Sequence, residues 1–143
     1  MADNPQKPAF DGDMAAYTAL GGALYRASAL TRGPWHPQQQ HAGPPIALVS
    51  HALEAAAQVH GLHHLARLTA NLLRPVPIAD IEVRVQEDYV GRNAGHFSAV
   101  ALADGKELIR ATALFQRDGR QVRPTPQARR LLRSLQQLEG LKK

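Results

Sequence analysis

One carboxylate stands alone in the most apolar helix that the sequence predicts. Glu54 is the only formally charged residue between Arg32 and Arg67, and it lies in the alanine- and leucine-rich segment from Ile46 to about His60. A carboxylate that is buried without a partner is costly and becomes more basic, which suits a general base. Two alternatives remain open, because Glu54 could instead reach a solvent edge or pair with Arg67 or Arg74.

Other kinds of chemistry lack the residues that they need. The chain contains no cysteine, which excludes a disulfide framework, a thiolate nucleophile and a Cys-ligated metal. It also contains no Gly-x-Ser-x-Gly elbow, no Walker loop and no Gly-x-Gly-x-x-Gly motif. The cluster His60-x-x-His63-His64 straddles Gly61 without a nearby carboxylate, so we expect no metal site there.

The net charge of +5 comes largely from the C-terminal end of the chain. The last 27 residues hold only two acidic residues, Asp118 and Glu139, against eight basic ones: Arg117, Arg120, Arg123, Arg129, Arg130, Arg133, Lys142 and Lys143. A basic tail can attract nucleic acid, anionic lipid or an anionic small molecule, and the alternative is a solvated helix face. No aromatic residue follows Phe115, whereas surfaces that bind nucleic acid interleave aromatic with basic residues, so nucleic acid is not the expected partner.

Turn residues and proline define the elements of the first half of the chain. Gly21-Gly22 separates two short β-compatible runs, 17–20 and 23–27, and predicts a hairpin. Two prolines precede Ile46 and start a helix that is apolar nearly all round, which is typical of a buried helix. Gly61 ends that helix.

Alternation of apolar and polar residues defines the second half. Asp104-Gly105 is a strong hairpin signal, and Pro126 opens an amphipathic helix with leucines on one side and arginines on the other. The period of two predicts four strands: 65–73, 79–89, 95–103 and 106–116.

The order of these elements, a hairpin, one helix and at least four antiparallel strands, predicts an α+β fold in which a sheet covers the helix. A length of 143 residues suits one such domain over 15–118, with a loose arm over 1–14 and a basic tail over 119–143. The polar N-terminus has no signal peptide, and no apolar run approaches the ~18 residues that would span a membrane. We therefore expect a cytoplasmic protein that does not bind membranes.

Three stretches carry a resemblance to a known family. They are Arg32-Gly-Pro-Trp35 with His41-Ala-Gly-Pro-Pro45, then Leu68 through Arg74-Pro-Val-Pro77, then Tyr89-Val-Gly-Arg92 followed by Ala111-Thr-Ala-Leu-Phe-Gln116. In this order and spacing they resemble the N-terminal hot-dog half of acyl-CoA thioesterase II and its thioesterase-like relatives. The resemblance covers roughly residues 17 to 117 and implies a single hot-dog domain, a long buried helix wrapped by a curved antiparallel sheet. Relatives usually carry two such halves in one chain, so the resemblance implies a homodimer and leaves a tetramer open.

The resemblance also implies where thioester chemistry would take place. Hot-dog thioesterases hold the thioester carbonyl at the N-terminus of the buried helix, where free N–H groups and the positive end of the helix dipole stabilise an oxyanion. In this chain Gly43 and Ile46 can donate there, whereas Pro44 and Pro45 have no N–H. His41 is a candidate to orient water or to donate to the carbonyl.

The base and the CoA contacts complete the expected site. Related single-domain thioesterases carry Asp or Glu about two turns into the helix, and this chain has Ser50 at the matching position. In acyl-CoA thioesterase II the catalytic acid, hydroxyl and glutamine belong to the other half. Glu54, one turn beyond Ser50, is therefore our candidate general base. Asn71 is expected to face the helix of the partner, and Arg74 and Arg92 are expected to bind the CoA phosphates.

The sequence thus predicts an acyl-CoA thioesterase, a hydrolase with its site at the homodimer interface, with acyl-CoA as substrate and with no cofactor or metal. Two alternatives stay open. The first is a non-catalytic homologue that binds acyl-CoA or an acyl chain, which the missing acid at position 50 favours. The second is a basic oligomer that binds a polyanion through residues 117–143.

Overall fold

The computed structural model describes residues 15–118 and 125–140, so the expected arm over 1–14 lies outside the described residues. The predicted order of elements is confirmed, with bounds that move by at most about three residues. Among the described residues, the periodicity did not predict a short 3-10 turn over Ala29–Thr31. The main elements are β1 (Tyr17–Gly21), β2 (Leu24–Ala27), α1 (Gly43–Gln58), β3 (His64–Leu72), β4 (Asp80–Val90), β5 (Ala94–Ala103), β6 (Lys106–Gln116) and α2 (Pro126–Gly140).

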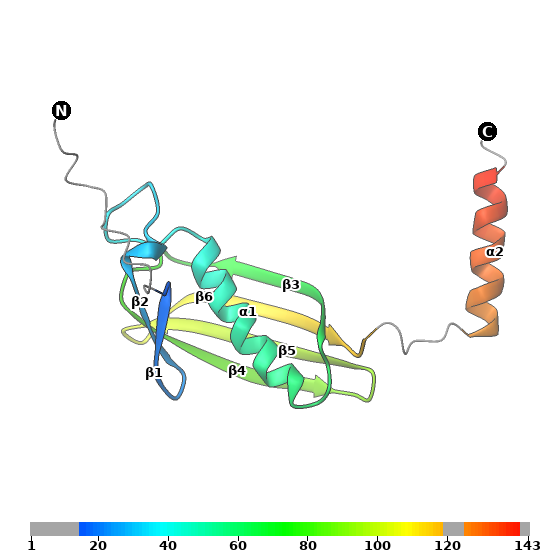
Figure 1. Ribbon diagram of the computed structural model, residues 1–143, viewed down its shortest axis with the longest axis horizontal. Helices are drawn as coiled ribbons and strands as arrows, with labels where there is room; N and C mark the ends of the chain where they lie inside the picture. Colours follow the sequence, from blue (N-terminus) through cyan, green and yellow to red (C-terminus); the bar gives the residue numbers. More distant parts are fainter. Residues whose placement is uncertain (1–14, 119–124, 141–143) are drawn as a thin grey trace.

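The six strands form one antiparallel sheet in the order β1-β2-β4-β5-β6-β3 (Figure 1). Both predicted hairpins are confirmed. Gly21 and Gly22 have φ of 103° and 59°, and Asp104 and Gly105 have φ of 49° and 71°, the left-handed conformations that a tight hairpin turn needs. The order leaves β1 and β3 as the two edge strands, and β3 is the longer, with nine residues against five.

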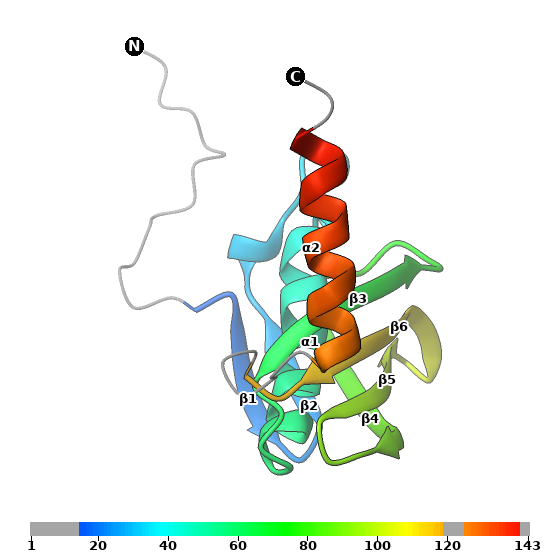
Figure 2. The ribbon, with the colours of Figure 1, turned by 90° about the vertical axis from the view of Figure 1, so that its right-hand side faces the viewer.

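The sheet curves around α1, which crosses one of its faces (Figure 2). The core lies between them, where Leu53 and Ala57 of α1 pack with Ile81, Phe97 and other buried residues of the sheet. Within the single chain α1 buries one side rather than all sides. Its buried residues are Pro45, Leu48, Val49, Leu53 and Ala57, and its exposed residues include Ala47, His51, Glu54, Ala55 and Gln58.

The end of α1 is fixed by close contacts around two glycines. Gly61 has φ of 72° and the Leu62 N–H donates to the Ala57 carbonyl at 3.2 Å, which confirms Gly61 as the helix stop. Gly95 in β5 is buried, and a Cβ there would lie 2.8 Å from both Leu62 Cδ1 and Phe97 Cε2. The chain therefore closes tightly at this end of the helix.

The predicted amphipathic C-terminal helix is present as α2, which stands apart from the sheet in Figure 1. Its four leucines at 131, 132, 135 and 138 remain 50–63% exposed. The leucine stripe is therefore outside the core of the hot-dog domain.

Candidate active site

The loop that leads into α1 is held in place by a buried glutamine. Gln40 is 8% exposed, its backbone N–H donates to the Val76 carbonyl at 2.8 Å, and its side-chain Nε2 donates to the Pro77 carbonyl at 2.8 Å. Its Oε1 accepts from the Tyr17 hydroxyl of β1. Burial raises the pKa of the Tyr17 phenol, so this group stays a hydrogen-bond donor. The start of α1 is thus tied to both β1 and the β3–β4 loop.

The first turn of α1 leaves the Gly43 N–H free to donate. Pro44 and Pro45 have no N–H, and the Ile46 N–H donates to the Ala42 carbonyl at 3.3 Å. The expectation that Ile46 would donate to a ligand is therefore wrong, because Ala42 is already helical, with φ of −67° and ψ of −29°, and supplies the acceptor. Among the described residues, the Gly43 N–H has no acceptor and lies at the positive end of the helix dipole.

The imidazole of His41 lies directly beside Gly43. A Cβ built on Gly43 would be 3.2 Å from His41 Cε1 and 3.4 Å from Nδ1, so glycine is what allows this approach. The His41 backbone is fixed by donation to the Thr31 carbonyl at 2.9 Å, while the residue as a whole is exposed. The structure therefore brings two of the predicted site residues, His41 and Gly43, together.

Glu54 lies far from that pair in the single chain. It is eleven residues after Gly43 on the same helix, which amounts to about 16 Å of rise. It is exposed and makes no ion pair within the described part of the chain. The expectation of a buried carboxylate is thus wrong for one chain, because the sheet covers only the opposite side of α1. Within one chain this distance is too long for one water molecule to bridge Glu54 and a thioester carbonyl held at Gly43.

Ser50, at the position where the resemblance implies an acid, is half-buried. Its hydroxyl donates to the Ile46 carbonyl one turn earlier at 2.8 Å. Glu54 follows four residues later and therefore lies on the same side of the helix as Ser50.

The remaining predicted residues are dispersed. Asn71 on β3 is exposed and pairs in register with Arg110 on the face opposite α1. Arg74 lies near the start of α1 and donates to the Glu107 carbonyl at 2.6 Å. Arg92 lies in the β4–β5 turn near the end of α1, where its carbonyl accepts from Arg117 Nε at 2.9 Å. Arg74 and Arg92 of one chain thus sit at opposite ends of a helix about 24 Å long.

Two hollows lie near the start of α1. One, of about 320 Å³, is bordered by Gln39, two cations and one carboxylate, Arg74, Lys106 and Asp104, so cations outnumber the carboxylate where a phosphate could bind. The other, of about 490 Å³, is an apolar groove between α1 and the β1–β2 hairpin, bordered by Tyr17 and Tyr25. The sequence did not identify either tyrosine as a site residue. In the β1–β2 pair Tyr17 lies opposite Ala27 and Tyr25 lies opposite Ala19. Both tyrosines are therefore on the same face of the hairpin.

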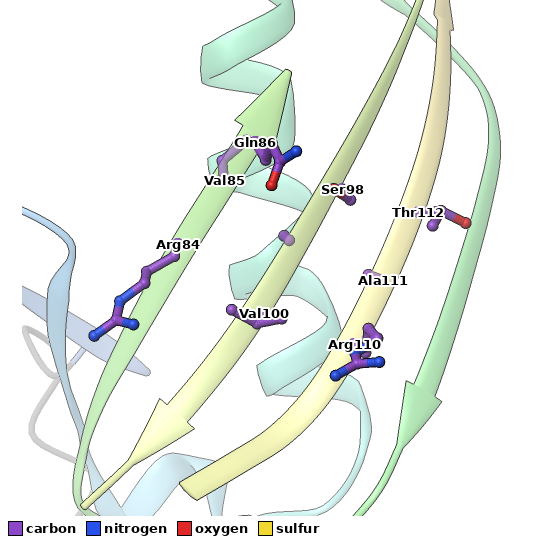
Figure 3. Close-up of a pocket in the computed structure, with 9 residues that line it drawn as sticks. Arg84, Val85, Gln86, Ser98, Val100, Arg110, Ala111 and Thr112 are labelled. Atoms are coloured by element: carbon purple, nitrogen blue, oxygen red, sulfur yellow. The ribbon is translucent and has the colours of Figure 1, made fainter. Parts of the chain in front are cut away.

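A third hollow, of about 390 Å³, lies on the face of the sheet away from α1 (Figure 3). Arg84 and Arg110 flank Val100 there. Each arginine pairs with a neighbouring glutamate, Arg84 with Glu82 and Arg110 with Glu107. Both cations that line this hollow are therefore compensated by a neighbouring carboxylate.

The histidine cluster does not gather metal ligands. The expected lack of a nearby carboxylate is wrong, because β4 brings Glu87 Oε1 to 2.6 Å from His60 Nε2. His63 and His64 are exposed. Within residues 15–118 and 125–140, no three groups of metal-binding type come together.

Comparison with known families decides the assignment. Residues 31–116 match the family model of the acyl-CoA thioesterase N-terminal domain. The chain belongs to this family. The matched span begins at the last residue of the 3-10 turn and ends with β6, so it contains all of α1 and the four long strands β3 to β6.

Solved structures show the same hot-dog fold. A thioesterase of Haemophilus influenzae is 20% identical, with 70% of this chain and 75% of that chain covered and a TM-score of 0.57. The PaaI protein of the E. coli phenylacetic acid degradation operon is 17% identical, with 72% and 78% covered and a TM-score of 0.60. A Bacillus halodurans protein, solved with CoA, is 15% identical, with 70% of each chain covered and a TM-score of 0.60. A search of curated proteins gave no match.

In the described ranges, neither helix has the length and apolar character needed to cross a bilayer.

Proposed function

We propose that this chain is an acyl-CoA thioesterase whose active site is completed by a second copy of the chain. The observation that carries the proposal is the free Gly43 N–H at the positive end of α1, beside the His41 imidazole. A donor in this position would stabilise the negative charge that develops on a thioester carbonyl oxygen under attack. Membership of the acyl-CoA thioesterase family supports the same chemistry.

In the proposed reaction the carbonyl oxygen accepts the Gly43 N–H while a water molecule attacks the carbonyl carbon. A general base takes one proton from that water. The tetrahedral intermediate then breaks its C–S bond, the base returns its proton to the sulfur, which leaves as the CoA thiol, and the carboxylic acid remains. The proposal requires no cofactor, and acyl-CoA is the substrate.

The general base in this proposal is Glu54 of the second copy. The long edge strand β3 has unpaired backbone groups along one side, which favours antiparallel pairing with another β3. A two-fold axis through such a pair reverses the second helix relative to the first. The later turns of one α1, which carry Glu54, would then lie opposite the start of the other, which carries Gly43.

The CoA moiety would occupy the hollow beside Arg74 and Lys106, where cationic side chains can bind phosphate oxygens. Two solved relatives support CoA as the ligand class. The Bacillus halodurans structure holds CoA, and a Streptococcus mutans structure, with a TM-score of 0.59 at 10% identity, holds acetyl CoA.

One observation favours a second function, an acyl-CoA binder without activity. The Ser50 hydroxyl donates to the Ile46 carbonyl, and Ser50 occupies the position where the resemblance implies an acid. A binder would use the same donor and the same cations without activating water.

Thiol release from a panel of acyl-CoAs separates the two. The thioesterase proposal predicts turnover with at least one member of the panel and a dimer in light scattering. Calorimetric binding of acyl-CoA with no thiol release from any member would establish the binder instead. A stable 15.5 kDa monomer at micromolar concentration would contradict the shared site.

A further inference from the structure

The apolar groove beside α1 begins where the proposed carbonyl site ends. Its helix wall consists of Pro44, Ala47, Leu48 and His51, which recur at the spacing of one helical face. Pro44 directly follows Gly43, so the groove opens next to the residue whose N–H would hold the thioester carbonyl. The groove volume of about 490 Å³ is within the range of small-molecule sites.

The opposite wall is made by the β1–β2 hairpin and is also apolar. Tyr17, Ala19 and Tyr25 supply it, and the Tyr17 hydroxyl is turned toward Gln40 as a donor. Among the described residues that border the groove there is no carboxylate, lysine or arginine. An uncharged, flexible, apolar ligand therefore suits it better than the nucleotide part of CoA.

The length of the helix wall also limits the length of the alkyl chain that can lie along it. From Pro44 to His51 the helix rises about 10 Å. An extended alkyl chain advances about 1.25 Å per carbon because its C–C bonds are close to 1.5 Å and tetrahedral. About eight carbons therefore fill the wall before the chain reaches the polar imidazole of His51.

We infer that this groove receives the acyl chain of the substrate and selects straight chains of about eight carbons. The inference rests on the proposed function, since it takes the thioester carbonyl to lie at Gly43. Each methylene that enters the groove should improve kcat/KM about two- to four-fold, since full burial of a CH₂ group is equivalent to about four-fold and one side of the groove is open. The gain should stop near eight carbons.

Ala47→Leu tests this with little risk to folding. Ala47 is exposed, and leucine is a good helix former, but its side chain would fill the groove at the carbonyl end. The matched control is Ala55→Leu, because Ala55 is exposed on the same helix and does not border the groove. The measured quantity is the ratio of kcat/KM for octanoyl-CoA to that for acetyl-CoA.

We expect Ala47→Leu to lower this ratio at least about four-fold, which is the loss of two or more methylene contacts at two- to four-fold each, while Ala55→Leu leaves it at the wild-type value. An unchanged ratio in Ala47→Leu would overturn the inference. So would a wild type whose kcat/KM is the same for both substrates.

A failure of the proposed thioesterase function can be told apart from a failure of the groove inference. If the wild type hydrolyses no acyl-CoA, the same ratio is taken from dissociation constants measured by calorimetry. Tighter binding of octanoyl-CoA than acetyl-CoA, lost in Ala47→Leu only, would support the groove while refuting the thioesterase. Equal dissociation constants in all three proteins would refute the groove as well.

Discussion

Gly95→Ala should destabilise the domain because it adds a methyl group where two rigid side chains already touch the backbone. The new Cβ would lie 2.8 Å from Leu62 Cδ1 and 2.8 Å from Phe97 Cε2, well inside normal carbon contact. Both side chains are 0% exposed, and Phe97 packs edge-on against Phe115 at a centroid distance of 5.6 Å. Neither can move without displacing further core residues, so the overpacking should cost about 1–3 kcal/mol.

Urea unfolding followed by circular dichroism measures this loss as a lower midpoint with an unchanged slope. Gly140→Ala is the matched control, since nothing lies within 4 Å of a Cβ at that exposed position of α2. It should leave the midpoint unchanged or raise it. If Gly95→Ala were as stable as the wild type, the close packing between the end of α1 and β5 would be refuted.

Two further predictions concern the loop before α1 and the basic tail. Burial raises the pKa of the Tyr17 phenol above its ordinary value of 10.0, so the unfolded chain ionises first and stability should fall as pH rises above about 10. Tyr17→Phe should reduce this alkaline loss in urea midpoints at pH 9 and 11, and equal losses in both proteins would contradict it. Deletion of residues 124–143 should leave a cooperative thermal melt, since the α2 leucines are exposed, while it weakens CoA binding at low salt. An unfolded truncated chain would show that the stripe is core.

The fold was predictable because its signals are local. Gly21-Gly22 and Asp104-Gly105 each require positive φ, and the strands and helices have different periods that can be followed along the chain. The exposure of Glu54 was not predictable in the same way. Alanine suits both surface and core, so an alanine-rich helix does not indicate which side the sheet covers: Ala55 is exposed, whereas Ala57 is 0% exposed.

The site was predicted only where its residues are neighbours in sequence. His41 and Gly43 are two residues apart and do lie together. Relations between residues distant in sequence could not be predicted from local patterns. Examples are the hydrogen bond from Tyr17 to Gln40 and the positions of Arg74 and Arg92 at opposite ends of α1. The prediction that the Ile46 N–H is free failed because α1 begins three residues earlier than its apolar pattern suggests. The Ala42 carbonyl therefore accepts from the Ile46 N–H.

The most direct test of a thioesterase site shared between two copies is the rate of thiol release by Glu54→Gln. The substitution keeps the size of the side chain and removes its basicity. Turnover should fall by ~10²-fold or more, CoA binding should stay nearly unchanged, and stability should shift by less than about 0.5 kcal/mol because Glu54 is exposed. Glu87→Gln, which removes an exposed carboxylate on β4, should retain wild-type turnover. Hydrolysis by Glu54→Gln at the wild-type rate would contradict the assignment of Glu54 as the base.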